Sequence, residues 1–354
     1  MMPGLRNGFV TTLGALTTWW RARSDVPRRE TARVVRVGVP ASRPRSNSKM
    51  AAHAEEALRT FLSVALDEKR SGPPAEAELA AMKPLLDAGS AALSRLEVQA
   101  KYLPRRPSML PKLLSAMAND SSSMRELAKI ISGDPTMLGN LLRVANSAVY
   151  RANDKKIDNL ERAVTRVGMD GIRSVIATAL MHPVLARGTG WFASFPETIW
   201  EQTQLAADAA ELHAARLERC DGFQARLLAL VHGLATNTVF RIVRDEVLKG
   251  RADSSKPAVA LLLEQWTTPI AQRIAASWDL PPEVQGALAA PPADNLLARS
   301  LFFGRLAGSQ LLMIRRGRIK EFSARAFVLA SDSRRQQIDR LWSRLAVEHL
   351  APAR

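Results

Sequence analysis

Apolar residues recur three and four positions apart along most of this chain, which is the spacing of one buried face of an α-helix. The spacing predicts helices over 54–66, 76–98, 109–117, 123–133, 135–145, 159–168, 170–182, 198–219, 223–248, 268–278, 283–290 and 295–314, and a terminal helix that ends at residue 350. Abundant Ala, Leu and Arg favour the same outcome, because unbranched side chains lose little rotamer freedom in a helix. We therefore expect an all-α protein built as a multi-helix bundle.

Helix-terminating residues separate these segments. Ser123 and Glu126 form a capping-box pattern, in which each side chain satisfies a free backbone amide. Pro135 follows an Asp, the arrangement of a cap before proline at the first helical position. Asn159 precedes the next apolar stretch, and Gly168 is placed to end it in a left-handed turn. Short helices joined by tight turns pack as a compact bundle.

Composition divides the chain into four parts. Residues 1–50 are rich in Arg, Pro and Ser and predict a disordered basic leader, and a start at Met50 would leave residues 1–49 untranslated. We expect a helical extension or hairpin over 51–100 and the main helical domain over 101–310. A basic turn and a C-terminal helix then occupy 311–354.

The net formal charge of +16 is unevenly distributed. The leader alone carries ten Lys and Arg against two Asp and Glu. The densest later run is Arg315, Arg316, Arg318 and Lys320, which is either a solvated surface turn or an anion-binding site whose affinity falls with salt. Arg outnumbers Lys, a bias that often reflects a GC-rich genome, and we find no motif that reads nucleic-acid sequence.

Several function classes lack their sequence signals. A single Cys220 excludes an internal disulfide framework and fits a reducing compartment, so we expect a cytoplasmic protein. The apolar run 8–20 is too short to cross a bilayer. No phosphate-binding glycine loop occurs, and no two histidines are spaced to share one helix face. We expect no cofactor.

Three segments, in order, resemble the first half of an HDOD domain. They are LPRRPSMLPKLL from Leu103, SSSMRELAKIISGDPTMLGNLLRVANSAVY from Ser121 and IDNLERAVTRVGMDGIRSVI from Ile157. A fainter likeness continues through the helix around His232 and the stretch SWDLPPEVQGAL. In total, the resemblance covers about Leu103 to Ala307.

The resemblance places this chain beside the metal-dependent HD phosphohydrolases. It implies that enzymatic relatives hold metal ions with a His on one helix, a His-Asp pair on the next and a distant Asp. Here Gln202 and its neighbours stand near the first position, Gly233 follows His232 in place of Asp, and Pro291 and Pro292 stand where members often have two His. Three protein ligands are the usual minimum for a catalytic ion, so we expect no metal and no enzyme.

What the family implies is a bacterial signalling or regulatory module that binds an unidentified signalling protein. The candidate partner-binding face contains Arg143, Asn146, Tyr150 and Arg151. A structural interpretation instead makes Asn146 a polar group that bonds the backbone where a helix ends. Two other functions stay open: a degenerate HD-type phosphohydrolase acting on nucleotides, and a basic nucleic-acid-binding regulator.

Overall fold

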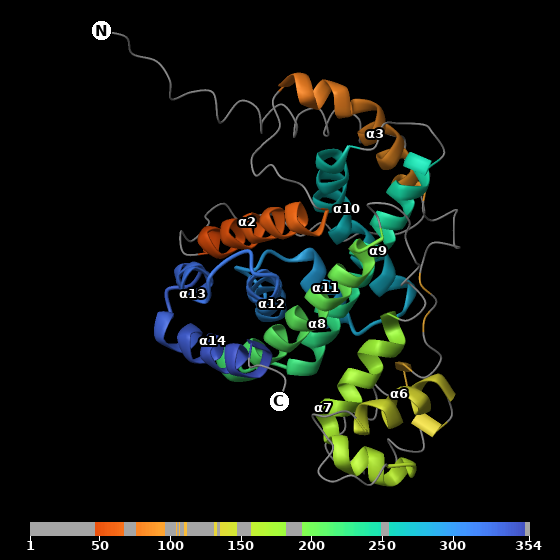
Figure 1. The fold of residues 1–354 in the computed structure, drawn as a ribbon, viewed down its shortest axis with the longest axis vertical. Helices are drawn as coiled ribbons and strands as arrows, with labels where there is room; N and C mark the ends of the chain where they lie inside the picture. The colour runs from red at the N-terminus through yellow and green to blue at the C-terminus, as the bar shows by residue number, and fades with distance from the viewer. Residues whose placement is uncertain are drawn as a thin grey trace. The chain divides into compact units, whose positions relative to one another are not determined.

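A computed structural model describes residues 47–66, 76–95, 104, 106, 110–111, 131–132, 135–146, 157–181, 193–248 and 255–350. Its helices are α2 (Asn47–Ala65), α3 (Glu76–Ser94), α6 (Pro135–Ala145), α7 (Leu160–Met181), α8 (Phe195–His213), the π-helix η3 (Ala214–Glu218), α9 (Gly222–Leu248), α10 (Lys256–Ser277), α11 (Pro282–Ala289), α12 (Leu296–Arg315), α13 (Glu321–Ala330) and α14 (Arg335–Leu350). The described ranges contain no strand, and the expected all-α fold is confirmed (Figure 1).

Helices α8, α9 and α12 form the centre of the fold (Figure 1). Helix α9 is apolar on nearly every side, which is typical of a helix buried all round. Helices α8 and α12 approach closely because two glycines of α12 face Ala206 of α8. A Cβ on Gly304 would lie 2.4 Å from the Ala206 carbonyl oxygen, and one on Gly308 would lie 2.6 Å from the Ala206 nitrogen.

The two N-terminal helices belong to the same core. Helix α2 packs on α12 and α10, whereas α3 packs on α9 and α10. The indole nitrogen of Trp266 donates to Ser90 Oγ at 3.3 Å, and Arg273 Nη1 donates to the Leu93 carbonyl at 2.9 Å. These two hydrogen bonds attach α3 to α10.

Two of the predicted helix ends are confirmed in α7. The Asn159 side chain accepts a hydrogen bond from the Arg162 amide at 3.1 Å, so it caps the first turn. Gly168 has a φ of 59°, where residues other than glycine are strained, and α7 is kinked there. The kink divides α7 into the two helical stretches that the sequence predicted.

The predicted start of α10 at Thr268 is wrong, because the helix begins at Lys256. The Ser255 hydroxyl accepts a hydrogen bond from the Ala258 amide and starts the helix twelve residues earlier. Pro269, expected near the N-terminus, instead lies inside the helix. Apolar burial on both sides of this proline outweighs the one backbone hydrogen bond that it removes.

Helix α13 was not predicted. Only Ala324 and Val328 of its ten residues are buried, so its apolar period is too short to detect. Ser331 ends α13 by donating its hydroxyl to the Val328 carbonyl, and Asp332 accepts from the Arg334 amide in the following turn. The expectation that Ser331 or Asp332 caps the terminal helix is therefore wrong.

Some expectations fall outside the described residues. The Ser123–Glu126 capping box and the leader up to residue 46 are among them. The last residues of the predicted leader, from Asn47 on, are helical, because α2 begins there. None of the described helices is long and apolar enough to span a bilayer.

Replacing Gly304 with Val tests the close approach of α8 and α12. The added side chain must push Ala206 away, so we expect the free energy of unfolding to fall by about 1–3 kcal/mol. Gly286→Ala on α11 is the control, because a Cβ there meets nothing within 4 Å. It should leave stability unchanged or raise it by up to about 1 kcal/mol through helix propensity. Urea unfolding followed by circular dichroism measures both; equal effects would contradict the packing argument.

Candidate functional site

Two of the positions compared above with HD-type metal ligands, the stretch around Gln202 on α8 and Gly233 on α9, lie on helices that pack against each other. Thr203 of α8 packs directly on Gly233 of α9, where a Cβ would lie 2.1 Å from Thr203 Oγ1. The same hydroxyl donates to the Ile199 carbonyl at 2.6 Å, so it is held in place. No side chain fits at Gly233 unless α8 and α9 move apart. The position beside His232 is therefore filled by contact between helices.

Gln202 and the two prolines make structural contacts. The Gln202 side chain is buried, and its amide nitrogen donates to Ser309 Oγ of α12 at 3.4 Å. Pro291 and Pro292 lie in the turn between α11 and α12, where the Pro292 carbonyl accepts from Arg299 Nε at 3.1 Å. These positions support packing and loop structure, and carry no carboxylate or imidazole.

His232 is a core histidine, as expected, with 6% of its surface exposed. Among the described residues its Nε2 finds no hydrogen-bond partner, so the expected hydrogen bond is not seen at that nitrogen. Burial lowers the pKa of His232 well below its ordinary value, and the positive charge of Arg305 on α12 lowers it further. The ring is therefore neutral at physiological pH.

Arg305 decides whether a divalent cation suits this region. Burial lowers the pKa of Arg305 to about 10, while Glu55 and Glu264 oppose the shift. The guanidinium thus stays charged at neutral pH and repels a metal ion near His232. Within the described residues, no group of three or more His, Cys, Asp and Glu could hold a metal. The residues at the HD-type positions do not fit a catalytic divalent ion.

A second polar cluster, which the sequence did not reveal, surrounds His213. This histidine is fully buried, its Nδ1 lies 3.0 Å from Ser300 Oγ, and its ring stacks on Phe303 at 4.5 Å. Burial lowers the pKa of His213 to about 3, and Arg334 and Arg299 act in the same direction. The imidazole is therefore a neutral structural group.

Glu218 is the centre of this cluster. Its side chain is 3% exposed and accepts from Arg334 at 2.7 Å and from Arg299 at 3.2 Å. Arg334 also pairs with Asp332 at 2.6 Å. Although Glu218 lies 3.7 Å from His213 Nε2, its charge is already shared by two guanidinium groups. The cluster joins η3 to α12 and to the start of α14, and its partners are too far apart in sequence to form a motif.

The basic run divides into paired and unpaired cations. Arg315 and Arg316 contact Glu201 at 3.3 and 2.9 Å, and Arg315 Nε donates to the His349 carbonyl at 2.9 Å. The side chains of Arg318 and Lys320 are exposed and have no hydrogen bond or ion pair in the described part of the chain. Anion binding by this run stays a prediction.

Asn146 uses its side chain to connect α6 with the segment before α7. Its Nδ2 donates to the Leu142 and Ile157 carbonyls, each at 2.7 Å, and its Oδ1 accepts from the Ile157 amide at 2.8 Å. These bonds support the structural interpretation of Asn146. The Arg143 side chain, Tyr150 and Arg151 lie outside the described part, so the partner-binding face stays a prediction.

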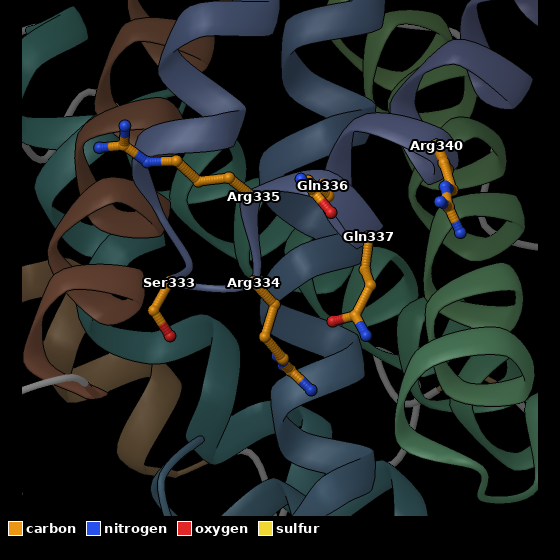
Figure 2. A pocket seen from close by; sticks show the side chains of 6 residues that line it. All are labelled: Ser333, Arg334, Arg335, Gln336, Gln337 and Arg340. Atoms are coloured by element: carbon orange, nitrogen blue, oxygen red, sulfur yellow. The ribbon is translucent and has the colours of Figure 1, made fainter.

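A surface pocket of about 420 Å³ opens at the start of α14 (Figure 2). Its lining is entirely polar: Ser333, Arg334, Arg335, Gln336, Gln337 and Arg340. Figure 2 shows that the side chains of Arg334, Arg335 and Arg340 point in different directions. The pocket is open and basic, and its lining offers neither a carboxylate nor an imidazole.

Comparison with known proteins identifies the family. The HDOD domain matches residues 103–291, more than half of the chain, and the chain therefore belongs to the HDOD family. A Shewanella amazonensis SB2B protein, provisionally named a phosphohydrolase, is similar in structure with a TM-score of 0.51 at 20% identity. The match covers 73% of this chain and 94% of that protein.

An HDOD domain protein of unknown function from Geobacter sulfurreducens is also similar, with a TM-score of 0.50 and 16% identity. The match covers 75% of this chain and 99% of that one. At these identities the likeness shows a shared fold. A comparison with curated proteins finds no match.

The buried His213 predicts a pH dependence of stability. Its pKa is about 3 in the folded state against an ordinary value of 6.5, so the unfolded chain binds more protons between those values. The neutral His213 therefore contributes fully to the free energy of unfolding above pH 6.5. Below that pH the contribution falls by about 1.4 kcal/mol per pH unit, because the unfolded chain binds one more proton. His213→Gln should flatten this dependence in urea titrations between about pH 7.5 and 5. Parallel curves for the variant and the wild type would assign the effect to other groups.

Proposed function

We propose that this protein is a non-catalytic regulatory module that transmits a signal by binding another protein. The observation that carries the proposal is the contact of Gly233 with Thr203, which leaves no space for an acidic side chain beside His232. Membership of the HDOD family supports a regulatory role.

The lack of a suitable ligand set supports the non-catalytic part of the proposal. Metal-dependent hydrolysis needs an ion that lowers the pKa of a bound water, and such an ion needs about three protein ligands. His232 is a single neutral imidazole, and its charged neighbour Arg305 is a cation. A module without this chemistry acts through the shape and charge of its surface.

The alternative function is a degenerate phosphohydrolase acting on nucleotides. It is favoured only by the name of the Shewanella amazonensis protein, whose likeness to this chain extends to the fold. The two functions differ in whether His232 contributes to an ion site, and that difference can be measured.

Metal analysis distinguishes the two functions. The purified protein and a His232→Ala variant are each incubated with Mn²⁺ or Fe²⁺ and desalted. The bound metal is then measured by inductively coupled plasma mass spectrometry. We expect both proteins to retain far less than one ion per chain and to leave nucleotides and cyclic dinucleotides unhydrolysed. One retained ion per wild-type chain, lost together with turnover in the variant, would establish the phosphohydrolase instead.

The partner is tested separately. Crosslinking in the native cell followed by affinity capture should recover a defined protein at a constant ratio to this chain. A Tyr150→Ala, Arg151→Ala variant is expected to lower that ratio if the predicted partner-binding face is correct. Recovery of no protein above the level of a mock capture would contradict the interaction.

A further inference from the structure

Several unpaired cations lie on the C-terminal part of the chain, outside the matched HDOD range. These residues are exposed and have no hydrogen bond or ion pair with their side chains in the described ranges: Arg318, Lys320, Arg335, Arg340 and Arg344. Other arginines of the same region are paired with carboxylates, namely Arg315, Arg316, Arg325 and Arg334. The unpaired five are therefore free to meet an external anion.

Ion pairs and hydrogen bonds hold these cations on one structural unit. Arg325 of α13 forms two hydrogen bonds of 2.7 Å with Asp339 of α14, so the two helices pack as a hairpin. Arg315 donates to the His349 carbonyl, which fixes the turn after α12 against the end of α14. We call residues 316–350 the C-terminal hairpin.

The positions of the cations cost stability. Arg340 and Arg344 are four residues apart on one helix face, where like charges repel. Arg335 occupies the first turn of α14, which contains no acidic residue, and a cation there opposes the helix dipole. None of these three arginines forms an ion pair in the described ranges, and a bound anion would relieve both repulsions.

The pocket at the start of α14 indicates the chemistry of that anion. It is lined by Ser, Arg and Gln side chains, which are residue types that contact phosphate and sugar groups of nucleic acids. The arginines spread outward instead of converging, which suits an extended polyanion better than one small ion (Figure 2). Protein interfaces have an apolar core, whereas nucleic-acid interfaces are polar and positively charged. The pocket lining matches the second kind.

We propose that the C-terminal hairpin binds the phosphate backbone of a nucleic acid without reading its sequence. This activity is separate from the regulatory function proposed above and does not depend on it. Arg340 and Arg344 contact phosphates along one face of α14, and Ser333, Arg335, Gln336 and Gln337 of the pocket hold the backbone at the helix start.

Fluorescence anisotropy with the full-length protein tests the proposal. The probes are a labelled DNA duplex and a labelled single-stranded RNA of arbitrary sequence, each titrated at salt concentrations between about 50 and 200 mM. Arg340→Ala, Arg344→Ala is compared with Arg162→Ala, Arg166→Ala, which removes a matched pair of exposed arginines four residues apart on α7. Both variants lose the same net charge, so the basic leader affects them equally.

We expect the α14 variant to bind the duplex at least several-fold more weakly than the wild type. The slope of its log affinity against log salt should be smaller in magnitude by about 1.8, or about 0.9 for each lost phosphate contact. The α7 variant should match the wild type, and circular dichroism should show that both variants are folded. Equal weakening by the two variants, or no binding by the wild type, would overturn the proposal. So would binding to phosphatidylserine vesicles without binding to either nucleic acid.

Discussion

The structure depends on the close approach of three central helices, α8, α9 and α12. Gly304 and Gly308 allow α12 to contact the backbone of α8, and Gly233 allows α9 to contact Thr203. Helices this close have dense dispersion contacts and no space for solvent between them. The same contact removes the volume that a ligand side chain would need beside His232. The packing that stabilises the bundle and the lack of space beside His232 therefore have one physical cause.

Charge in this protein is arranged in two ways. In the interior, charged groups are paired within helical junctions: Glu218 accepts from Arg299 and Arg334, and Arg226 of α9 bonds Asp208 and Glu211 of α8. Unpaired buried charges would be strongly destabilising, so these pairs must form together as the helices pack. On the C-terminal hairpin, by contrast, five cations are exposed and their side chains have no partner in the described ranges: Arg318, Lys320, Arg335, Arg340 and Arg344. These exposed side chains are available to other molecules.

The part of the candidate site that could be predicted is the type of residue at each position compared with a metal ligand. Gly233 after His232 and prolines at 291 and 292 already indicate that ligand atoms are missing. The sequence could not show that Thr203 fills the space at Gly233, since the two residues belong to different helices. It also could not show that Glu201 pairs with Arg315 and Arg316, because more than a hundred residues separate them.

The sequence by itself determined the helical class, the family and most helix ends, because apolar spacing, caps and glycine conformations act over a few neighbouring residues. Asn159, Gly168 and Asn295 end or start helices through such local bonds and dihedral angles. Only the tertiary structure decided that α10 continues through Pro269, that α13 forms, and that His213 is held neutral among buried ions. Each of these depends on burial against distant segments, whose free energy outweighs the local preference of the chain.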